Sequence, residues 1–109
     1  METAQLTARA MEIRQRFADF ERAKSKKEWT TEEVMQGFVV DVGDLMKLVM
    51  AKGGRRHIED VDRKLAHELS DCLWSVLVLS KTYGLDIEKE FMKTMDELDA
   101  GLAAKMKTP

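Results

Sequence analysis

Apolar side chains recur three and four positions apart in four separate stretches of this chain. That spacing is the period of one face of an α-helix, so each stretch predicts an amphipathic helix. The four predicted helices cover about residues 3–24, 30–52, 60–83 and 87–105. We expect the last helix to bury its apolar face, which consists of Ile87, Phe91, Met95, Leu98 and Leu102.

The ends of these stretches carry residues that are typical of helix boundaries. Thr30 and Glu33 have the spacing of a capping box, in which each side chain accepts a hydrogen bond from the backbone N–H of the other residue. Gly53-Gly54 and Gly84 tolerate a positive φ and predict the ends of the second and third helices. Asp86 predicts the N-terminal cap of the fourth helix.

The two central helices are more apolar than a single neighbouring helix can cover. The third is apolar around Val76–Leu79. The second is apolar over most of its circumference, through Val34, Met35, Phe38, Val39, Val42, Leu45, Met46, Leu48, Val49 and Met50. Four helices joined by short loops favour a four-helix bundle, and the surplus apolar surface predicts a homo-oligomer, at least a dimer.

Composition and charge narrow the class of protein and its partners. A length of 109 residues fits a single domain, 1–109, and one Pro, six Gly and 35% charged residues favour an all-α fold. A net charge of -2 with interleaved signs disfavours a nucleic acid polymer as partner. No apolar run approaches the roughly 20 residues that span a membrane. Charges within residues 1–20 and a single Cys72, which cannot form an internal disulfide, predict a cytoplasmic protein.

Two acidic pairs lie on the two most apolar helices, Asp41 with Asp44 and Glu68 with Asp71. Residues three apart lie about 60° from each other around a helix, so the two acids of each pair share a face. Helical projection places Asp41 and Glu68 within the apolar arcs of their helices and not opposite them. Ionised carboxylates in such a setting are costly unless they are paired or bind a metal. The pattern therefore predicts a shared divalent cation site.

Oxygen ligands favour a hard cation, Mg²⁺, for which Mn²⁺ could substitute. Zinc is disfavoured because Cys72 stands alone and the two histidines are not at ligand spacing. A di-iron carboxylate bundle would require Glu-x-x-His pairs, which the chain lacks. A purely structural alternative stays open, in which the acids form salt bridges with Lys47, Lys64 or Lys81.

The order Asp41-x-x-Asp44, 23 intervening residues and Glu68-x-x-Asp71 resembles the MazG-type all-α nucleoside triphosphate pyrophosphohydrolases. Their signature is Glu-x-x-Glu followed by Glu-x-x-Asp on the next helix, and the similarity covers about residues 17–100. The resemblance implies a four-helix MazG-like bundle that forms dimers or larger assemblies. It also implies that the four acids bind Mg²⁺, that one of them orients or deprotonates the attacking water, and that a nucleoside triphosphate is split into monophosphate and pyrophosphate.

Two departures from the family pattern concern the first acidic pair and the substrate contacts. The first pair is Asp/Asp where the family usually has Glu/Glu, and the chain contains no Asn, although family members often use one on the last helix. Lys93 is the candidate phosphate contact, with Lys89, Lys52, Arg55 and Arg56 as further cations. Trp29 either stacks on a base or packs onto its helix.

Two functions follow from this interpretation. The leading hypothesis is a Mg²⁺-dependent nucleotide pyrophosphohydrolase that removes non-standard or surplus dNTPs. The alternative is a non-catalytic MazG-like helical dimer that binds a nucleotide or a protein partner.

Overall fold

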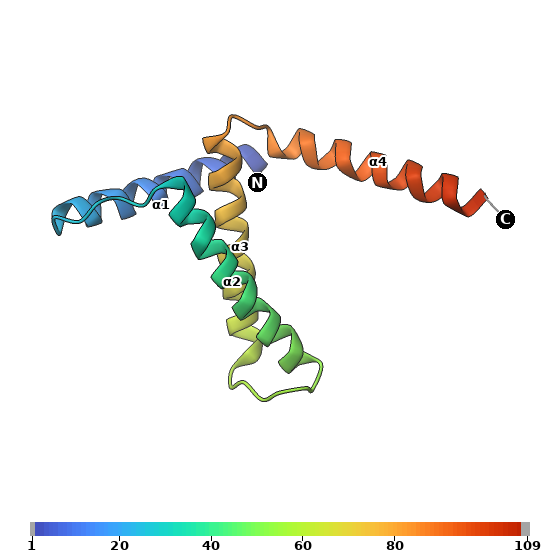
Figure 1. The fold of residues 1–109 in the computed structure, drawn as a ribbon, viewed down its shortest axis with the longest axis horizontal. Helices are drawn as coiled ribbons and strands as arrows, with labels where there is room; N and C mark the ends of the chain where they lie inside the picture. The colour runs from blue at the N-terminus through green and yellow to red at the C-terminus, as the bar shows by residue number, and fades with distance from the viewer. Residues whose placement is uncertain (1, 108–109) are drawn as a thin grey trace.

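The computed structural model describes residues 2–107, which form four α-helices and no strand (Figure 1). The helices are α1 (Thr3–Ala23), α2 (Thr31–Lys52), α3 (Val61–Thr82) and α4 (Ile87–Lys107). The all-α prediction is confirmed for the described residues, and each boundary lies within two residues of the position predicted from the sequence. No helix among these residues is both long and apolar enough to cross a membrane.

Local capping interactions explain why the boundaries fall where they do. The backbone N–H of Glu33 donates to Thr30 Oγ1 at 3.1 Å, and the N–H of Thr30 donates to Glu33 Oε1 at 3.1 Å. The predicted capping box at the start of α2 is therefore confirmed. Gly54 and Gly84 adopt φ values of +79° and +69° beyond the ends of α2 and α3, as their positions predict. Gly53 has φ -81°, so only the second glycine of the Gly53-Gly54 pair uses the positive-φ region. Asp86 Oδ1 accepts from the N–H of Lys89 at 3.1 Å and caps α4.

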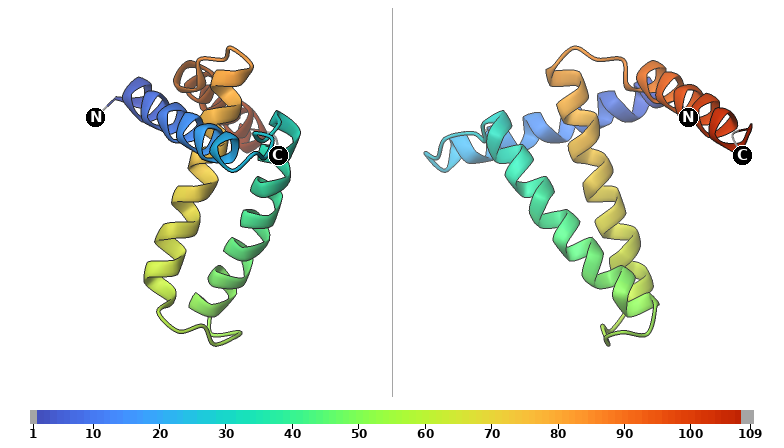
Figure 2. Two further views of the ribbon diagram at one scale, coloured as in Figure 1. Left: turned by 90° about the vertical axis from the view of Figure 1, so that its left-hand side faces the viewer. Right: turned by 45° about the vertical axis from the view of Figure 1, so that its right-hand side comes forward.

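Helices α2 and α3 form an antiparallel hairpin, and α1 crosses the end of α3 that is far from the hairpin loop (Figure 2). The buried core lies where these three helices meet, and it consists of Ala10, Val34, Leu77 and Val78. Trp74 closes this core, because its indole N–H donates to the carbonyl of Ala10 at 3.1 Å and its ring meets Phe17 edge-on at 6.2 Å. Burying Trp74 with its N–H satisfied ties α3 to α1.

Helix α4 extends away from the α2–α3 hairpin and buries none of its residues within this chain (Figure 1). Phe91, Leu98 and Leu102, predicted to be buried, are each more than half exposed. The sequence pattern identifies which face of a helix is apolar but not which surface covers it. One chain alone therefore does not close a four-helix bundle, and bundle closure together with the oligomeric state stays a prediction.

Candidate metal site

Three of the four predicted carboxylates meet between α2 and α3. Asp41, Asp44 and Glu68 each offer a carboxylate oxygen, and these oxygens lie within 4.8 Å of one another. We call these three residues the acidic trio. Two of its members come from the middle of α2 and one from α3, so the antiparallel hairpin is what brings them together. Residues 53–60, between the two helices, form the hairpin loop.

The apolar periodicity of α2 fixes the direction of Asp41. Val34 and Leu48 lie seven residues before and after it, on nearly the same face of the helix, and both are buried. Since these two residues anchor that face of α2 within the protein, Asp41 between them is turned toward α3 and is half-buried. Glu68 is likewise half-buried on α3. The predicted location of Asp41 and Glu68 within apolar arcs matches this arrangement.

Burial and neighbouring acids raise the pKa of Glu68 above its ordinary value. Desolvation is the largest cause, followed by a side-chain hydrogen bond with Asp41 and by the charges of Asp41, Asp71 and Asp44. A hydrogen bond that raises the pKa is one that the protonated Glu68 carboxyl donates to the Asp41 carboxylate. A cation bound at these carboxylates would therefore compete with protons for them.

The nearby thiol responds to the same negative charges. Burial, and then the charges of Asp41, Glu68 and Asp71, raise the pKa of Cys72. A raised pKa keeps Cys72 in the thiol form, which is a poor nucleophile and a poor metal ligand. Oxygen atoms are therefore the donors that this site offers to a cation.

Asp71, the fourth predicted ligand, lies outside the acidic trio. Its Oδ2 is 3.2 Å from His67 Nε2, one helical turn earlier on α3. The step from Glu68 to Asp71 is the same three residues as that from Asp41 to Asp44, so helical spacing alone does not separate Asp71 from the trio. The structure thus groups Asp71 with His67, a residue for which the sequence suggested no partner.

Basic side chains border the acidic trio on one side. A hollow of about 260 Å³ is lined by Asp44, Lys47, Leu48, Ile58, Arg63, Lys64, His67 and Glu68. Arg63 forms an ion pair with Asp60. Within residues 2–107, no ion pair joins Lys47, Lys64 or Lys81 to any of the four predicted ligands. The salt-bridged alternative is therefore not found for these three lysines. The hollow was not predicted from the sequence. The pattern that could have indicated it is that Lys47 lies three residues after Asp44 and Lys64 four residues before Glu68, which places each lysine on the same helix face as an acid.

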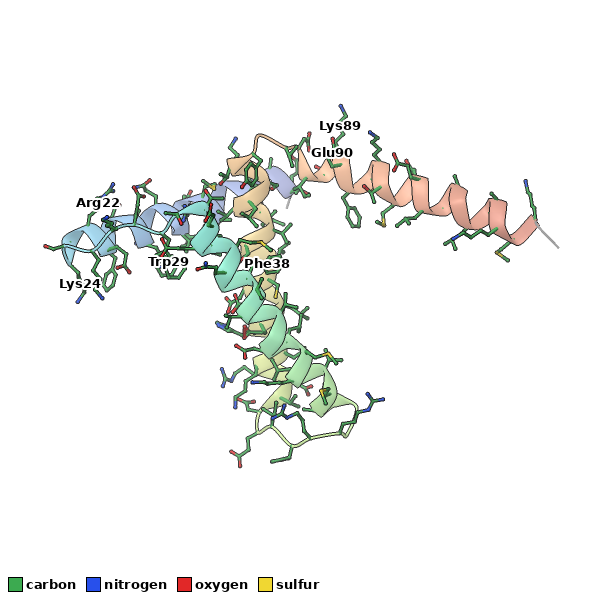
Figure 3. The ribbon with its side chains drawn as sticks, viewed as in Figure 1. Arg22, Lys24, Trp29, Phe38, Lys89 and Glu90 are labelled. Carbon is green, nitrogen blue, oxygen red and sulfur yellow. The ribbon has the colours of Figure 1, made fainter. Side chains whose placement is uncertain are left out.

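The two predicted substrate contacts lie elsewhere in the chain. Trp29 stacks on Phe17 of α1, with ring centroids 6.1 Å apart and an interplanar angle of 6°, and its carbonyl accepts from Arg14 at 3.0 Å (Figure 3). It precedes α2, whose first residue, Thr31, lies about 15 Å along the helix from Asp41. Lys93 belongs to α4, which leads away from the hairpin. Within one chain the structure brings neither residue to the acidic trio.

The donor set fits one hard divalent cation. Oxygens that share a cation at about 2.0–2.5 Å are separated by roughly 3–5 Å, and the trio spans at most 4.8 Å. Comparisons with protein-family models, curated proteins and solved structures give no match.

Proposed function

We propose that this chain is a Mg²⁺-dependent nucleoside triphosphate pyrophosphohydrolase of the MazG-like type, for which Mn²⁺ can replace Mg²⁺. The observation that carries the proposal is the convergence of Asp41, Asp44 and Glu68 within 4.8 Å. Their spacing in the sequence is the one that resembles the family, and their separation suits a shared cation. The adjacent basic hollow supports a phosphorylated substrate over a neutral one.

The acidic trio would hold the cation, and each of the remaining groups has a defined role. When bound, Mg²⁺ neutralises charge on the phosphates and lowers the pKa of a coordinated water. Lys47 and Lys64 line the hollow and bind the phosphates of the pyrophosphate leaving group as point charges. Asp71 lies outside the trio and is oriented by His67, so it accepts a hydrogen bond from the attacking water.

Replacing one of the lysines that line the hollow tests the proposed phosphate contact and has a matched control. Full-length protein with Mg²⁺ is assayed for pyrophosphate release across a panel of NTPs and dNTPs. Because a hydrogen bond to a charged group contributes about 1.5–3 kcal/mol, Lys64→Ala should lower kcat/KM by about 10- to 100-fold, mainly through KM. Lys81→Ala, at the opposite end of α3, should leave kcat/KM within about twofold.

The result that would overturn the proposal is the absence of turnover with every nucleotide in the panel. Release of orthophosphate in place of pyrophosphate would equally rule out the proposed bond cleavage.

The second candidate, a non-catalytic helical dimer, is favoured by the exposed apolar faces of α2 and α4. Titration with a nonhydrolysable nucleotide separates the two, because only the enzyme requires Mg²⁺ to bind it.

A further inference from the structure

An arginine at the hollow beside the acidic trio keeps most of its hydrogen-bond donors available. Arg63 lines the hollow, and its Nε donates a hydrogen bond to Asp60 Oδ2, three residues earlier in the chain. A guanidinium carries five N–H donors in one plane, and this bond engages one of them. Among residues 2–107, Arg63 forms an ion pair with no acid other than Asp60. The edge formed by Nη1 and Nη2 is therefore available to a ligand.

Asp60 holds Arg63 instead of capping its own helix. It occupies the N-cap position of α3, where an aspartate usually accepts a hydrogen bond from an N–H of the first turn, but its side chain makes no such bond. Its backbone lies in the left-handed region, at φ +56° and ψ +39°. Both side chains of the pair are more than half exposed, and such pairs contribute little stability. The contact therefore serves to orient the guanidinium more than to stabilise the fold.

The hollow connects Arg63 to the acidic trio. Asp44 and Glu68 belong to the trio and also line the hollow. On α3, Glu68 lies five residues after Arg63, a rise of about 7.5 Å along the helix axis. A ligand that carries negative groups in a row over this length therefore contacts Arg63 and a cation at the trio at the same time. A chain of phosphates is a ligand of this kind.

The three cations around the hollow differ in how they recognise a phosphate. Lys47 and Lys64 each present an ammonium group, which acts as a point charge. Arg63 presents a planar fork, which pairs two N–H groups with two oxygens of one phosphate. A terminal phosphate has more unbridged oxygens and more negative charge than an internal one. It is therefore the better partner for the fork.

We propose that Arg63, oriented by Asp60, binds the terminal phosphate of the substrate. The inference rests on the proposed function for the identity of the substrate, although the phosphate contact itself is measurable without turnover. Arg63 is then a specificity-determining residue, and Asp60 is a positioning residue that acts through it. In the hydrolysis assay the loss of this contact appears mainly in KM, because the terminal phosphate is not the one that is attacked.

Binding of inorganic pyrophosphate tests the contact, and the chain offers a matched control. Arg22 and Asp19 form the same kind of exposed pair, three residues apart, on α1 (Figure 3). In isothermal titration with pyrophosphate and Mg²⁺, Arg63→Gln should raise the dissociation constant by about 10- to 100-fold, because a hydrogen bond to a charged group is lost. Arg63→Lys should recover only part of this affinity, since it keeps the charge without the fork. Arg22→Gln should bind as wild type.

Two substitutions at Asp60 separate a positioning role from a structural one. Asp60→Gly tolerates the positive φ but removes the carboxylate, so it should raise the dissociation constant for pyrophosphate by about 2- to 10-fold with little change in Tm. Asp60→Asn keeps a side-chain oxygen that accepts from Arg63 Nε and should restore most of the affinity. An Asp60→Gly variant with unchanged affinity would refute the positioning role. Tighter binding would refute it too, because Asp60 would then only compete with phosphate for Arg63.

The outcomes of this titration are separable from those of the hydrolysis assay. Wild-type protein that binds no pyrophosphate at millimolar concentration with Mg²⁺ would overturn the inference, whatever the turnover. An Arg63→Gln or Arg63→Lys variant as tight as wild type, or an Arg22→Gln variant weakened as much as Arg63→Gln, would do so as well. Binding that depends on Arg63, together with no turnover of any nucleotide, would support the phosphate contact and refute the proposed function. Far-ultraviolet circular dichroism verifies that every variant keeps its helices.

Discussion

Replacing Glu68 with glutamine tests the electrostatics of the acidic trio. The substitution preserves the size of the side chain and removes one negative charge from the cluster. We expect Glu68→Gln to be more stable than wild type without a divalent cation and to respond less to added Mg²⁺. Both effects have the same cause, which is the mutual repulsion of carboxylates that only a cation relieves.

The magnitude follows from the separation of the carboxylate oxygens. Two unit charges 4.8 Å apart repel by about 0.9 kcal/mol at the dielectric constant of water, and Glu68 takes part in two such pairs, with Asp41 and Asp44. Solvent around the half-buried cluster and salt both reduce this repulsion. We therefore expect Glu68→Gln to raise the free energy of unfolding by about 1 kcal/mol at neutral pH and low salt.

The pH dependence has a defined sign. Because the pKa of Glu68 is raised in the folded state, the folded protein binds more protons than the unfolded chain between the ordinary glutamate pKa and the raised value. Stability contributed by this group therefore falls as pH rises through that window. Below the ordinary pKa of about 4.3 the wild type and Glu68→Gln should be equally stable. Above the window the difference should reach its full value.

Thermal unfolding followed by circular dichroism in EDTA measures this difference. For a domain of about 100 residues, 1 kcal/mol corresponds to about 4–8 °C in Tm. Adding Mg²⁺ should raise the Tm of wild type by mass action and that of Glu68→Gln by much less. Glu97→Gln on exposed α4 is the matched control and should behave as wild type. Equal Tm values in EDTA at neutral pH, or an equal Mg²⁺ response, would refute the reasoning.

Two further substitutions separate metal binding from catalysis and test a helix cap. Asp71→Asn should keep most of the Mg²⁺-induced rise in Tm, because the Asp71 carboxylate lies outside the trio. The same variant should lose about 100-fold or more in its rate of pyrophosphate release. A Tm response to Mg²⁺ as small as that of Glu68→Gln would contradict this expectation. Thr30→Ala should lower the free energy of unfolding in urea by about 1 kcal/mol, since Glu33 loses its capping acceptor. Thr30→Ser should keep the wild-type midpoint, and an unchanged midpoint in Thr30→Ala would argue against a stabilising cap.

The helices were predictable because their signals are local. The capping box at Thr30 and the positive φ of Gly54 and Gly84 depend on residues within one turn of each boundary, so spacing alone identifies them. The direction of α4 depends instead on the backbone of the Gly84–Asp86 connection. An apolar face at Phe91 and Leu98 predicts that something covers it. It does not identify the covering surface.

The sequence could predict those features of the site that depend only on which face of a single helix a residue occupies. Asp41 could be placed beside Val34 and Leu48 by periodicity, and the structure has it there. The separation of Asp71 from the trio depends on which way α3 turns its side chains relative to α2, a tertiary property. The hollow around Lys47 escaped prediction for the same reason, because its lining residues come from two helices and the loop between them.

The α2–α3 hairpin thus has two chemically distinct sides that are built from adjacent residues. Asp41 and Val42 are neighbours in the sequence, but the 100° step of a helix turns Asp41 toward α3 and leaves Val42 46% exposed on another side of α2. Val42 and Met46 are too exposed to contribute much to the core of one chain. Their apolar character is the reason that the sequence predicts a homo-oligomer. The same helical step thus lets one short stretch of α2 place a carboxylate in the trio and an apolar side chain at the surface.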